Sequence, residues 1–301
     1  MSQSKLGGHC CTNARVPFHD TVMGCMGADW TCCQVFLGSE FTHNKRRELN
    51  STETKKLIKI VGFTGFKVYT HYPYTMNLVK KCTKAGMTGL QSELDTLAPF
   101  GGRIVIHPNS PAVKGGPTNK QTTHKDYVPQ YKAAIKTMMC NLGLLKYPAA
   151  FSLLLEPPAG EGQKIGWSFD QIAYIVKLLK QKNLPVGLCI DTCHSFAAGL
   201  STFMGRRSVN RFFDKLAEIG ALELVKCVHL NDSKGAYESM KDSHAPLCCG
   251  LIWQDRPRGF ESMVNKCREL GIDIICETDG DEGVKKCLGV PLCGADEDTV
   301  L

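Results

Sequence analysis

Nine side chains that can ligate a metal ion fall at or just beyond short apolar runs of the sequence. Five are histidines and four are carboxylates, and the whole chain has only nine histidines. Imidazole and carboxylate groups without thiolate are typical of catalytic zinc or manganese sites, and less clearly of iron. The candidate ligands are His71, His107, Glu156, Asp191, His194, His229, Asp242, His244 and Glu277.

The number of candidates predicts a cluster of ions. Nine ligands exceed what one or two metals need, so three divalent ions are the natural count once shared carboxylates and waters complete the coordination. Four carboxylates and three such ions would leave a net charge of about +2. A positive cavity suits a phosphate ester better than a neutral sugar, and bound metal ions can activate water for hydrolysis.

The candidates are positioned by eight short apolar runs that alternate with segments of helical spacing. Such nearly continuous hydrophobicity is expected of parallel strands covered by helices. We predict one α/β domain over residues 1–301, a closed (β/α)8 TIM barrel, with an open doubly wound sheet as the alternative. The predicted strands are Leu6–Cys10, Thr31–Leu37, Phe66–His71, Arg103–His107, Phe151–Glu156, Pro185–Asp191, Leu224–Leu230 and Ile272–Thr278.

The segments between the strands include amphipathic stretches. Ser168 is a suitable N-cap, and Ile172, Ile175, Val176 and Leu179 recur on one face after it. Because helices cover the outside of a TIM barrel, each such stretch needs one apolar face. Three helices are predicted, over Asp126–Leu145, Ser168–Gln181 and Arg256–Leu270.

The predicted topology brings the candidate ligands together. Six of them end a predicted strand, and in a parallel barrel all C-terminal strand ends open onto one face. The spacing of Asp191 and His194 places both on one turn, where a strand gives way to a helix. Asp242 and His244 alternate in an extended segment after the seventh strand, so their side chains point the same way.

Composition narrows the class of protein. Hydrophobic residues make up 43% and charged residues 22%, which excludes a disordered, collagen-like or coiled-coil chain. The net charge of +7 is compatible with a polyanionic partner without establishing one. The N-terminus lacks the pattern of a signal peptide, and no stretch approaches the roughly 18 apolar residues of a membrane span. We expect a soluble, intracellular protein without a membrane partner.

Sixteen cysteines raise the question of a disulfide framework. Three pairs are immediate neighbours, a poor geometry for bridging, and small disulfide-stapled domains are far denser in cysteine. We expect most of them to be reduced and to pack as small hydrophobes. Cys189 and Cys193 around Asp191, or Cys248 and Cys249, could instead hold a structural zinc, but no second C-x2-C pair supports that alternative.

Several segments resemble one enzyme family. The segments LLLEPPAGEG (Leu153–Gly162), GLCIDTCHSFAAG (Gly187–Gly199) and HLNDSK (His229–Lys234) are similar to endonuclease IV, the trinuclear-zinc apurinic/apyrimidinic (AP) endonuclease of DNA repair. Segments His71–Asn77, Asp242–His244 and Ile275–Thr278 agree in order and spacing. The resemblance runs from about Phe66 to Thr278 and is weaker in the first 65 residues, where only short segments such as Gln34–Leu37 are similar.

The resemblance implies a xylose-isomerase-like TIM barrel in which the nine candidates bind three Zn²⁺, with Mn²⁺ as a possible substitute. It implies that Glu156 bridges metals and orients or deprotonates the attacking water. The substrate would be double-stranded DNA, cut 5′ to an abasic site in base excision repair to leave a 3′-hydroxyl and a 5′-deoxyribose phosphate. Trimming of blocked 3′ ends would use the same phosphate position, and we expect the enzyme to act as a monomer.

Candidate DNA contacts lie near the same strand ends. Tyr74 matches the aromatic residue of the family that inserts into the duplex, with packing at the barrel rim as the alternative. Ser243 occupies a position where the family usually has an arginine. We expect this difference to affect DNA binding more than metal binding. Four basic residues either contact phosphates or belong to an ordinary solvated face: Arg46, Arg47, Lys114 and Lys234.

Two other functions remain open at this point. A sugar isomerase or epimerase on the same barrel would use one or two metals from similar strand ends, together with a lysine or second glutamate placed for proton transfer. The larger ligand set, including Asp242 and His244, argues against it. A damaged-DNA binding protein that has lost catalysis is the other alternative.

Overall fold

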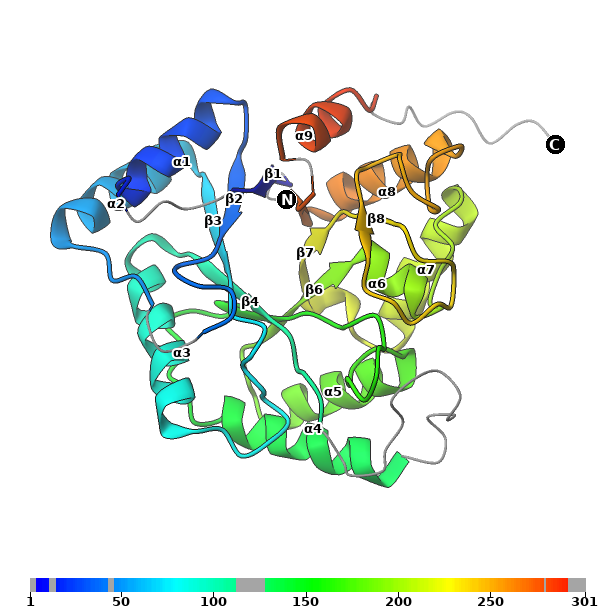
Figure 1. Cartoon of the computed structure of the whole chain (residues 1–301), viewed down its shortest axis with the longest axis horizontal. Coiled ribbons are helices and arrows are strands. Elements are labelled where there is room, and N and C mark those ends of the chain that lie inside the picture. The colour runs from blue at the N-terminus through cyan, green and yellow to red at the C-terminus, as the bar shows by residue number, and fades with distance from the viewer. Residues whose placement is uncertain (1–3, 11–14, 43–45, 112–127, 279, 292–301) are drawn as a thin grey trace.

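Eight parallel strands close into a barrel in the computed structural model, which describes residues 4–10, 15–42, 46–111, 128–278 and 280–291. The strands neighbour one another in the order β1–β10–β7–β6–β5–β4–β3–β2, and β1 closes the ring by pairing with both β2 and β10. Helices surround this ring (Figure 1). The predicted TIM barrel is therefore confirmed, and the open doubly wound sheet is excluded.

Each barrel strand lies inside one of the predicted runs and is shorter than that run. Six of the strands end before the predicted run does, whereas the third and the sixth barrel strands along the chain end where predicted and begin later. After β5, for example, Glu156 still donates its N–H to Ile106 at 2.9 Å, and Pro157 then breaks the pattern. The barrel strands are β1 (Leu6–His9), β2 (Cys32–Val35), β3 (Lys67–His71), β4 (Arg103–Ile106), β5 (Leu153–Leu155), β6 (Gly187–Asp191), β7 (Val225–His229) and β10 (Asp273–Cys276).

The helices follow the predicted alternation. Ser168 caps α5 as expected, because its hydroxyl accepts the N–H of Gln171 at 3.3 Å. Helix α4 ends at Leu142, not at Leu145 as predicted, because the chain from Gly143 tightens into turns; the predicted start at Asp126 lies outside the described residues. The helices are α1 (Phe18–Gly27), α2 (Ser51–Thr64), α3 (Lys84–Leu97), α4 (Val128–Leu142), α5 (Phe169–Gln181), α6 (Thr192–Ala197), α7 (Arg206–Glu218), α8 (Pro257–Leu270) and α9 (Gly280–Leu288), with short 3-10 turns at Ala98–Phe100 and Leu222–Leu224.

The barrel interior is filled by side chains and is not a pore. Space inside is tight enough that a Cβ atom on Gly7 would lie 1.8 Å from the carbonyl oxygen of Cys32, so only glycine fits there. A second, larger apolar layer lies between the strands and the helices. The interior layer consists of Cys32, Tyr69, Val105, Leu154, Cys189, Cys227 and Ile275.

The end of the barrel where the strands begin is closed by a buried charge network. Asp273, at the start of β10, accepts from Lys67 at 2.7 Å and from the Tyr69 hydroxyl at 2.5 Å. Arg103 lies 3.6 Å from the same carboxylate. Asp273 is fully buried and its charge is matched by these cations, so loss of one partner would leave a buried unpaired charge. The opposite face, where the strands end, is left for chemistry.

The cysteines are mostly packing residues, as predicted. None of the fourteen cysteines within the described residues forms a disulfide, and nine of them are buried. Cys189 and Cys193 are both buried, whereas Cys249 is exposed. Among the described helices, none is long and apolar enough to cross a bilayer.

Candidate metal centre

The strand ends form a small polar cavity. His71, Asp191 and His229 are the last residues of β3, β6 and β7. His107, Glu156 and Glu277 directly follow β4, β5 and β10. The cavity has a volume of about 300 Å³ and is lined by His71, Tyr74, His107, Glu156, His194, Asp242, His244 and Glu277.

One group of ligands joins β3, β4 and β5. The Nε2 atom of His71 lies 3.1 Å from Glu156 Oε2, and His107 Nε2 lies 3.6 Å from the same oxygen. Each ring places its other nitrogen against a backbone carbonyl: His71 Nδ1 on Tyr72 and His107 Nδ1 on Glu156. A carbonyl can only accept, so Nδ1 carries the proton in both rings and Nε2 is left to bind a metal.

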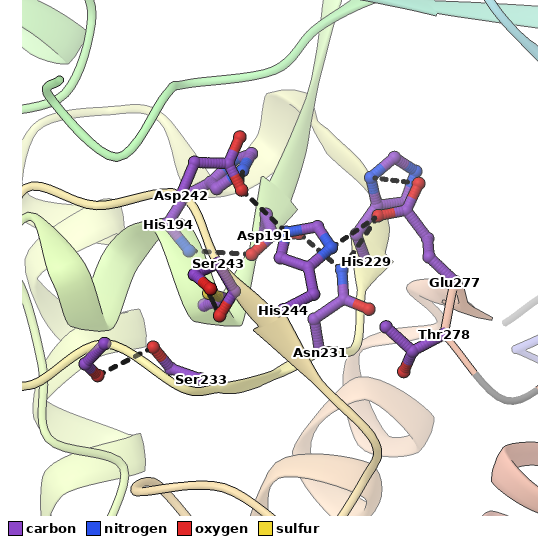
Figure 2. Close-up of polar contacts among 12 residues, drawn as sticks. Asp191, His194, His229, Asn231, Ser233, Asp242, Ser243, His244, Glu277 and Thr278 are labelled. Carbon is purple, nitrogen blue, oxygen red and sulfur yellow. Dashed lines mark hydrogen bonds and ion pairs between the residues drawn. The ribbon is translucent and has the colours of Figure 1, made fainter.

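A second group joins α6 to the segment after β7. His194 Nε2 and His244 Nε2 lie 3.3 and 3.2 Å from Asp242 Oδ1. Both nitrogens are buried, and neither makes a well-formed hydrogen bond. The two rings and the carboxylate approach one another in Figure 2. Buried nitrogens that converge on a carboxylate without hydrogen bonds are what a metal site presents when its ligands are in place.

A short hairpin holds Asp242 and His244 in this position. β8 (Asp232–Ser233) and β9 (His244–Ala245) pair antiparallel, so that Ser233 lies opposite His244. The buried Asp232 carboxylate accepts backbone N–H groups from the returning chain, at 3.0 Å from Gly250 and 2.9 Å from Ile252. The sequence predicted the alternation of Asp242 and His244, but the anchoring by Asp232 is visible only in the structure.

A third set of candidate ligands joins β6, β7 and β10. His229 Nδ1 lies 3.0 Å from Glu156 Oε1 and 3.4 Å from Glu277 Oε1. Asn231 donates to Asp191 Oδ2 at 2.6 Å and to Glu277 Oε2 at 2.8 Å, and so ties two carboxylates together. Glu156 therefore contacts ligands of both this set and the set of His71 and His107.

Gln34 on β2 is a positioning residue that sequence reasoning did not single out. Its amide nitrogen faces Glu277 Oε1 at 2.8 Å and His9 Nδ1 at 3.1 Å, and its amide oxygen faces His229 Nε2 at 2.8 Å. The oxygen can only accept, so His229 Nε2 donates to it and Nδ1 is directed at the carboxylates. The signal available in the sequence was a single amide side chain within the largely apolar run Thr31–Leu37.

The imidazole and carboxylate groups of the cluster shift one another's pKa values. Burial raises the pKa of the Glu156 carboxyl, but the neighbouring His229 and the hydrogen bonds to it outweigh burial, and the pKa lies well below its usual value. Burial alone lowers the pKa of His229 and of His244, yet the carboxylates raise them to about 10 and about 9. Protons on these imidazoles balance the carboxylates, and divalent cations can replace those protons.

An aromatic rim borders the cavity. Tyr74 is 44% exposed, and its ring stacks on His107 with centroids 5.8 Å apart and an interplanar angle of 28°. The Phe36 ring packs edge-on against the Tyr74 ring, with centroids 5.7 Å apart. Phe41 lies 6.4 Å from Tyr74 and is 64% exposed. A flat apolar ring is thus presented to solvent directly above the ligand cluster.

The basic candidates have different surroundings. Arg46 forms a buried ion pair with Glu93 at 2.6 Å, and Arg47 binds Glu53 at 2.7 Å. Both guanidinium groups are paired with carboxylates of the protein, and their contact with DNA stays a prediction. Lys234 is exposed, and its backbone N–H bonds to Ser243 beside the cluster. Lys114 lies outside the described residues.

The chain is similar to known proteins over most of its length. The chain is 28% identical to a protein named probable endonuclease 4 of Mycoplasmopsis pulmonis, over 91% of this chain and 92% of that protein. It superposes on endonuclease IV from Thermus thermophilus with a TM-score of 0.73 at 24% identity, covering 94% of this chain and 96% of the other. The 3-keto-D-glucoside 4-epimerase of E. coli has a TM-score of 0.56 at 13% identity, over 95% and 98%.

A family model covers most of the barrel. The model described as xylose isomerase-like TIM barrel matches residues 28–291, which include all nine candidate ligands. This range begins just before β2 and ends after α9. The chain therefore belongs to the xylose isomerase-like TIM barrel family.

Proposed function

We propose that this protein is an AP endonuclease, which hydrolyses the DNA backbone 5′ to an abasic site and leaves a 3′-hydroxyl and a 5′-deoxyribose phosphate. The observation that carries the proposal is a cluster of nine imidazole and carboxylate side chains beneath an exposed aromatic ring. Seven of them line one cavity, and Asp191 and His229 contact these seven from behind, at His244 and Glu156. The similarity to proteins named endonuclease 4 over nearly the whole chain supports it. Trimming of blocked 3′ ends would require the same phosphate position.

The donor set fits three Zn²⁺. His71, His107 and Glu156 would hold one ion, and His194, Asp242 and His244 another. Asp191, His229 and Glu277, with Glu156 shared, would hold the third. When bound, the ions would acidify water and offset the negative charge of the phosphodiester. The chemistry of the donors, oxygen and imidazole nitrogen without thiolate, suits Zn²⁺ and also Mn²⁺.

Glu156 is the residue that we assign to catalysis. Its two oxygens face different ligand groups, Oε2 toward His71 and Oε1 toward His229. Its low pKa keeps it a carboxylate at neutral pH, so its oxygens can accept a hydrogen bond from a water molecule and orient it. We propose that the same carboxylate takes the proton of that water when it attacks. Gln34 and Asn231 hold the surrounding ligands in place by hydrogen bonds.

Selectivity for an abasic nucleotide follows from size and stacking. A cavity of about 300 Å³ is at the small end for ligand sites. It suits a sugar phosphate better than a nucleotide with its base. A nucleotide without a base has lost its stacking, so moving it out of the duplex costs little. Tyr74 would fill the space left in the base stack, and the exposed Lys234 would contact a backbone phosphate.

Substitution of Glu156 with Gln separates the proposed enzyme from a non-catalytic DNA-binding protein. Zinc-loaded wild-type protein should nick a duplex that carries one abasic analogue and leave an intact duplex uncut. E156Q should bind the abasic duplex with little loss but should not nick it, and S262A, a partly buried serine of α8 outside the ligand cluster, serves as the control. Binding without nicking by the wild-type protein would reject the proposal.

A further inference from the structure

Three cysteines outside the cluster of nine ligands meet beside the first two strands. Cys10 directly follows β1, Cys25 lies on α1 and Cys33 lies on β2, elements near the N-terminus that are blue in Figure 1. All three sulfur atoms lie within 4.8 Å of one another, and those of Cys10 and Cys25 are 3.5 Å apart. The trio joins one βαβ unit of the barrel.

The alternation of side chains along β2 places Cys33 in this trio. Cys32 points into the barrel interior, where it belongs to the inner apolar layer. Cys33 points the opposite way, into the layer beneath α1. Cys25 and Cys33 are buried, whereas Cys10 is only partly buried and borders solvent. Cys10 is therefore the most exposed of the three sulfur-bearing residues.

The spacing of the sulfur atoms suits a metal with thiolate ligands. A zinc-to-sulfur bond of about 2.3 Å places neighbouring sulfurs about 3.8 Å apart in tetrahedral geometry. The observed distances, from 3.5 Å to at most 4.8 Å, bracket this value. Small shifts of the side chains would bring all three sulfurs to bonding distance.

The charges around the trio also favour a cation. Hydrogen bonds from Cys10 and Cys33 lower the pKa of Cys25, and the same contacts raise the pKa of Cys33 well above its usual value. The three sulfur atoms thus interact closely, and a metal ion can replace the protons of their thiols. Asp281, at the start of α9, adds a further negative charge near Cys25.

We propose that Cys10, Cys25 and Cys33 form a separate site for one Zn²⁺, bound by three thiolates and completed by one further ligand. The thiols lose their protons to solvent as the ion binds, so no oxidant or reductant is needed. This site would tie β1, α1 and β2 together and would serve stability, not hydrolysis. It stands independently of the proposed nuclease activity.

Cobalt titration of the reduced, metal-free full-length protein tests this site. Co²⁺ substitutes for Zn²⁺, and only thiolate ligands give intense sulfur-to-cobalt charge-transfer absorption in the near ultraviolet. We expect this absorption to saturate at one equivalent of thiolate-bound ion and to disappear when Zn²⁺ is added. It should persist in H71A, which affects only the other cluster, and in C140S, whose cysteine is exposed on α4.

Two variants at the trio complete the test. C25S and C33S should each lower the charge-transfer absorption by at least tenfold while circular dichroism shows an unchanged fold. Two results would overturn the proposal: no charge-transfer absorption in the reduced wild-type protein, or full absorption in both variants. The second result would assign the ion to other cysteines, such as Cys189 and Cys227 in the barrel interior.

Discussion

Replacing Gln34 with leucine should weaken zinc binding while the barrel stays folded. In the structure, the Gln34 amide accepts from His229 Nε2 and donates to Glu277 Oε1, both at 2.8 Å. Leucine is close to glutamine in size but has no polar group. The substitution therefore leaves the fully buried Nε2–H of His229 without an acceptor. His229 is then free to rotate or to change tautomer, and Nδ1 is no longer held toward the carboxylates.

The size of the effect follows from these two bonds. A hydrogen bond to a charged group contributes about 1.5–3 kcal/mol, and loss of the outer partner of a metal-ligating histidine typically lowers metal affinity by about 10- to 100-fold. We expect a zinc affinity lower by about that factor at the ion that His229 ligates. Nicking should fall in parallel at limiting zinc and recover in part at high zinc, since Gln34 itself does not touch the ion.

Chelator competition measures this directly. Zinc affinity would be determined for wild type, Q34L and Q181L, the last being an exposed control at the end of α5, with thermal unfolding as a check on the fold. Q181L should match wild type in every measurement. Equal zinc affinity in Q34L and wild type would refute the role of Gln34 as the residue that orients His229.

Three further predictions test other parts of the site. Carboxylates raise the pKa values of His194, His229 and His244 above their usual range, so these rings carry a proton at neutral pH when no metal is bound. Zinc must displace about two to three protons, and we therefore expect zinc affinity to rise with pH. Calorimetric titrations at several pH values measure the affinity, and repeats in buffers of different ionisation enthalpy count the released protons. R46M should lower the free energy of unfolding by about 3–5 kcal/mol in urea titrations, because it leaves Glu93 as a buried unpaired charge. If stability is unchanged and DNA binding depends less steeply on salt, Arg46 contacts a phosphate instead. Y74A should weaken binding to abasic duplex by about 1–3 kcal/mol in a fluorescence titration, with unchanged zinc content, whereas Y74F should bind like wild type.

The fold and the ligand cluster were predictable because both depend on local patterns. Continuous apolar runs indicate parallel strands, and the parallel barrel then carries every strand end to the same face. Asp191 and His194 needed only one turn of chain to meet, and the Asp191 side chain caps α6 by accepting the His194 N–H at 2.7 Å. Apolar runs and short spacings of this kind can be recognised without knowing which distant segments pack against them.

The contacts that sequence reasoning missed join residues far apart in the chain. Arg46 pairs with Glu93 on α3, a partner that no local pattern around Arg46 indicates. Gln34 acquires its role only when β2 lies in register beside β1 and the barrel brings His229 and Glu277 within reach. The trio of Cys10, Cys25 and Cys33 likewise depends on how α1 packs over β1 and β2, so each cysteine alone indicated only packing.

Restoring zinc to the metal-free protein and following cleavage of a duplex with one abasic site tests the proposed metal-dependent hydrolysis most directly. We expect no nicking without metal and full nicking when the His and carboxylate cluster holds three ions per chain. The ions are counted in C25S so that the thiolate site does not contribute. The products should be a 3′-hydroxyl and a 5′-deoxyribose phosphate. Nicking by the metal-free protein, maximal activity with a single ion, or cleavage on the 3′ side of the abasic site would contradict the proposed hydrolysis.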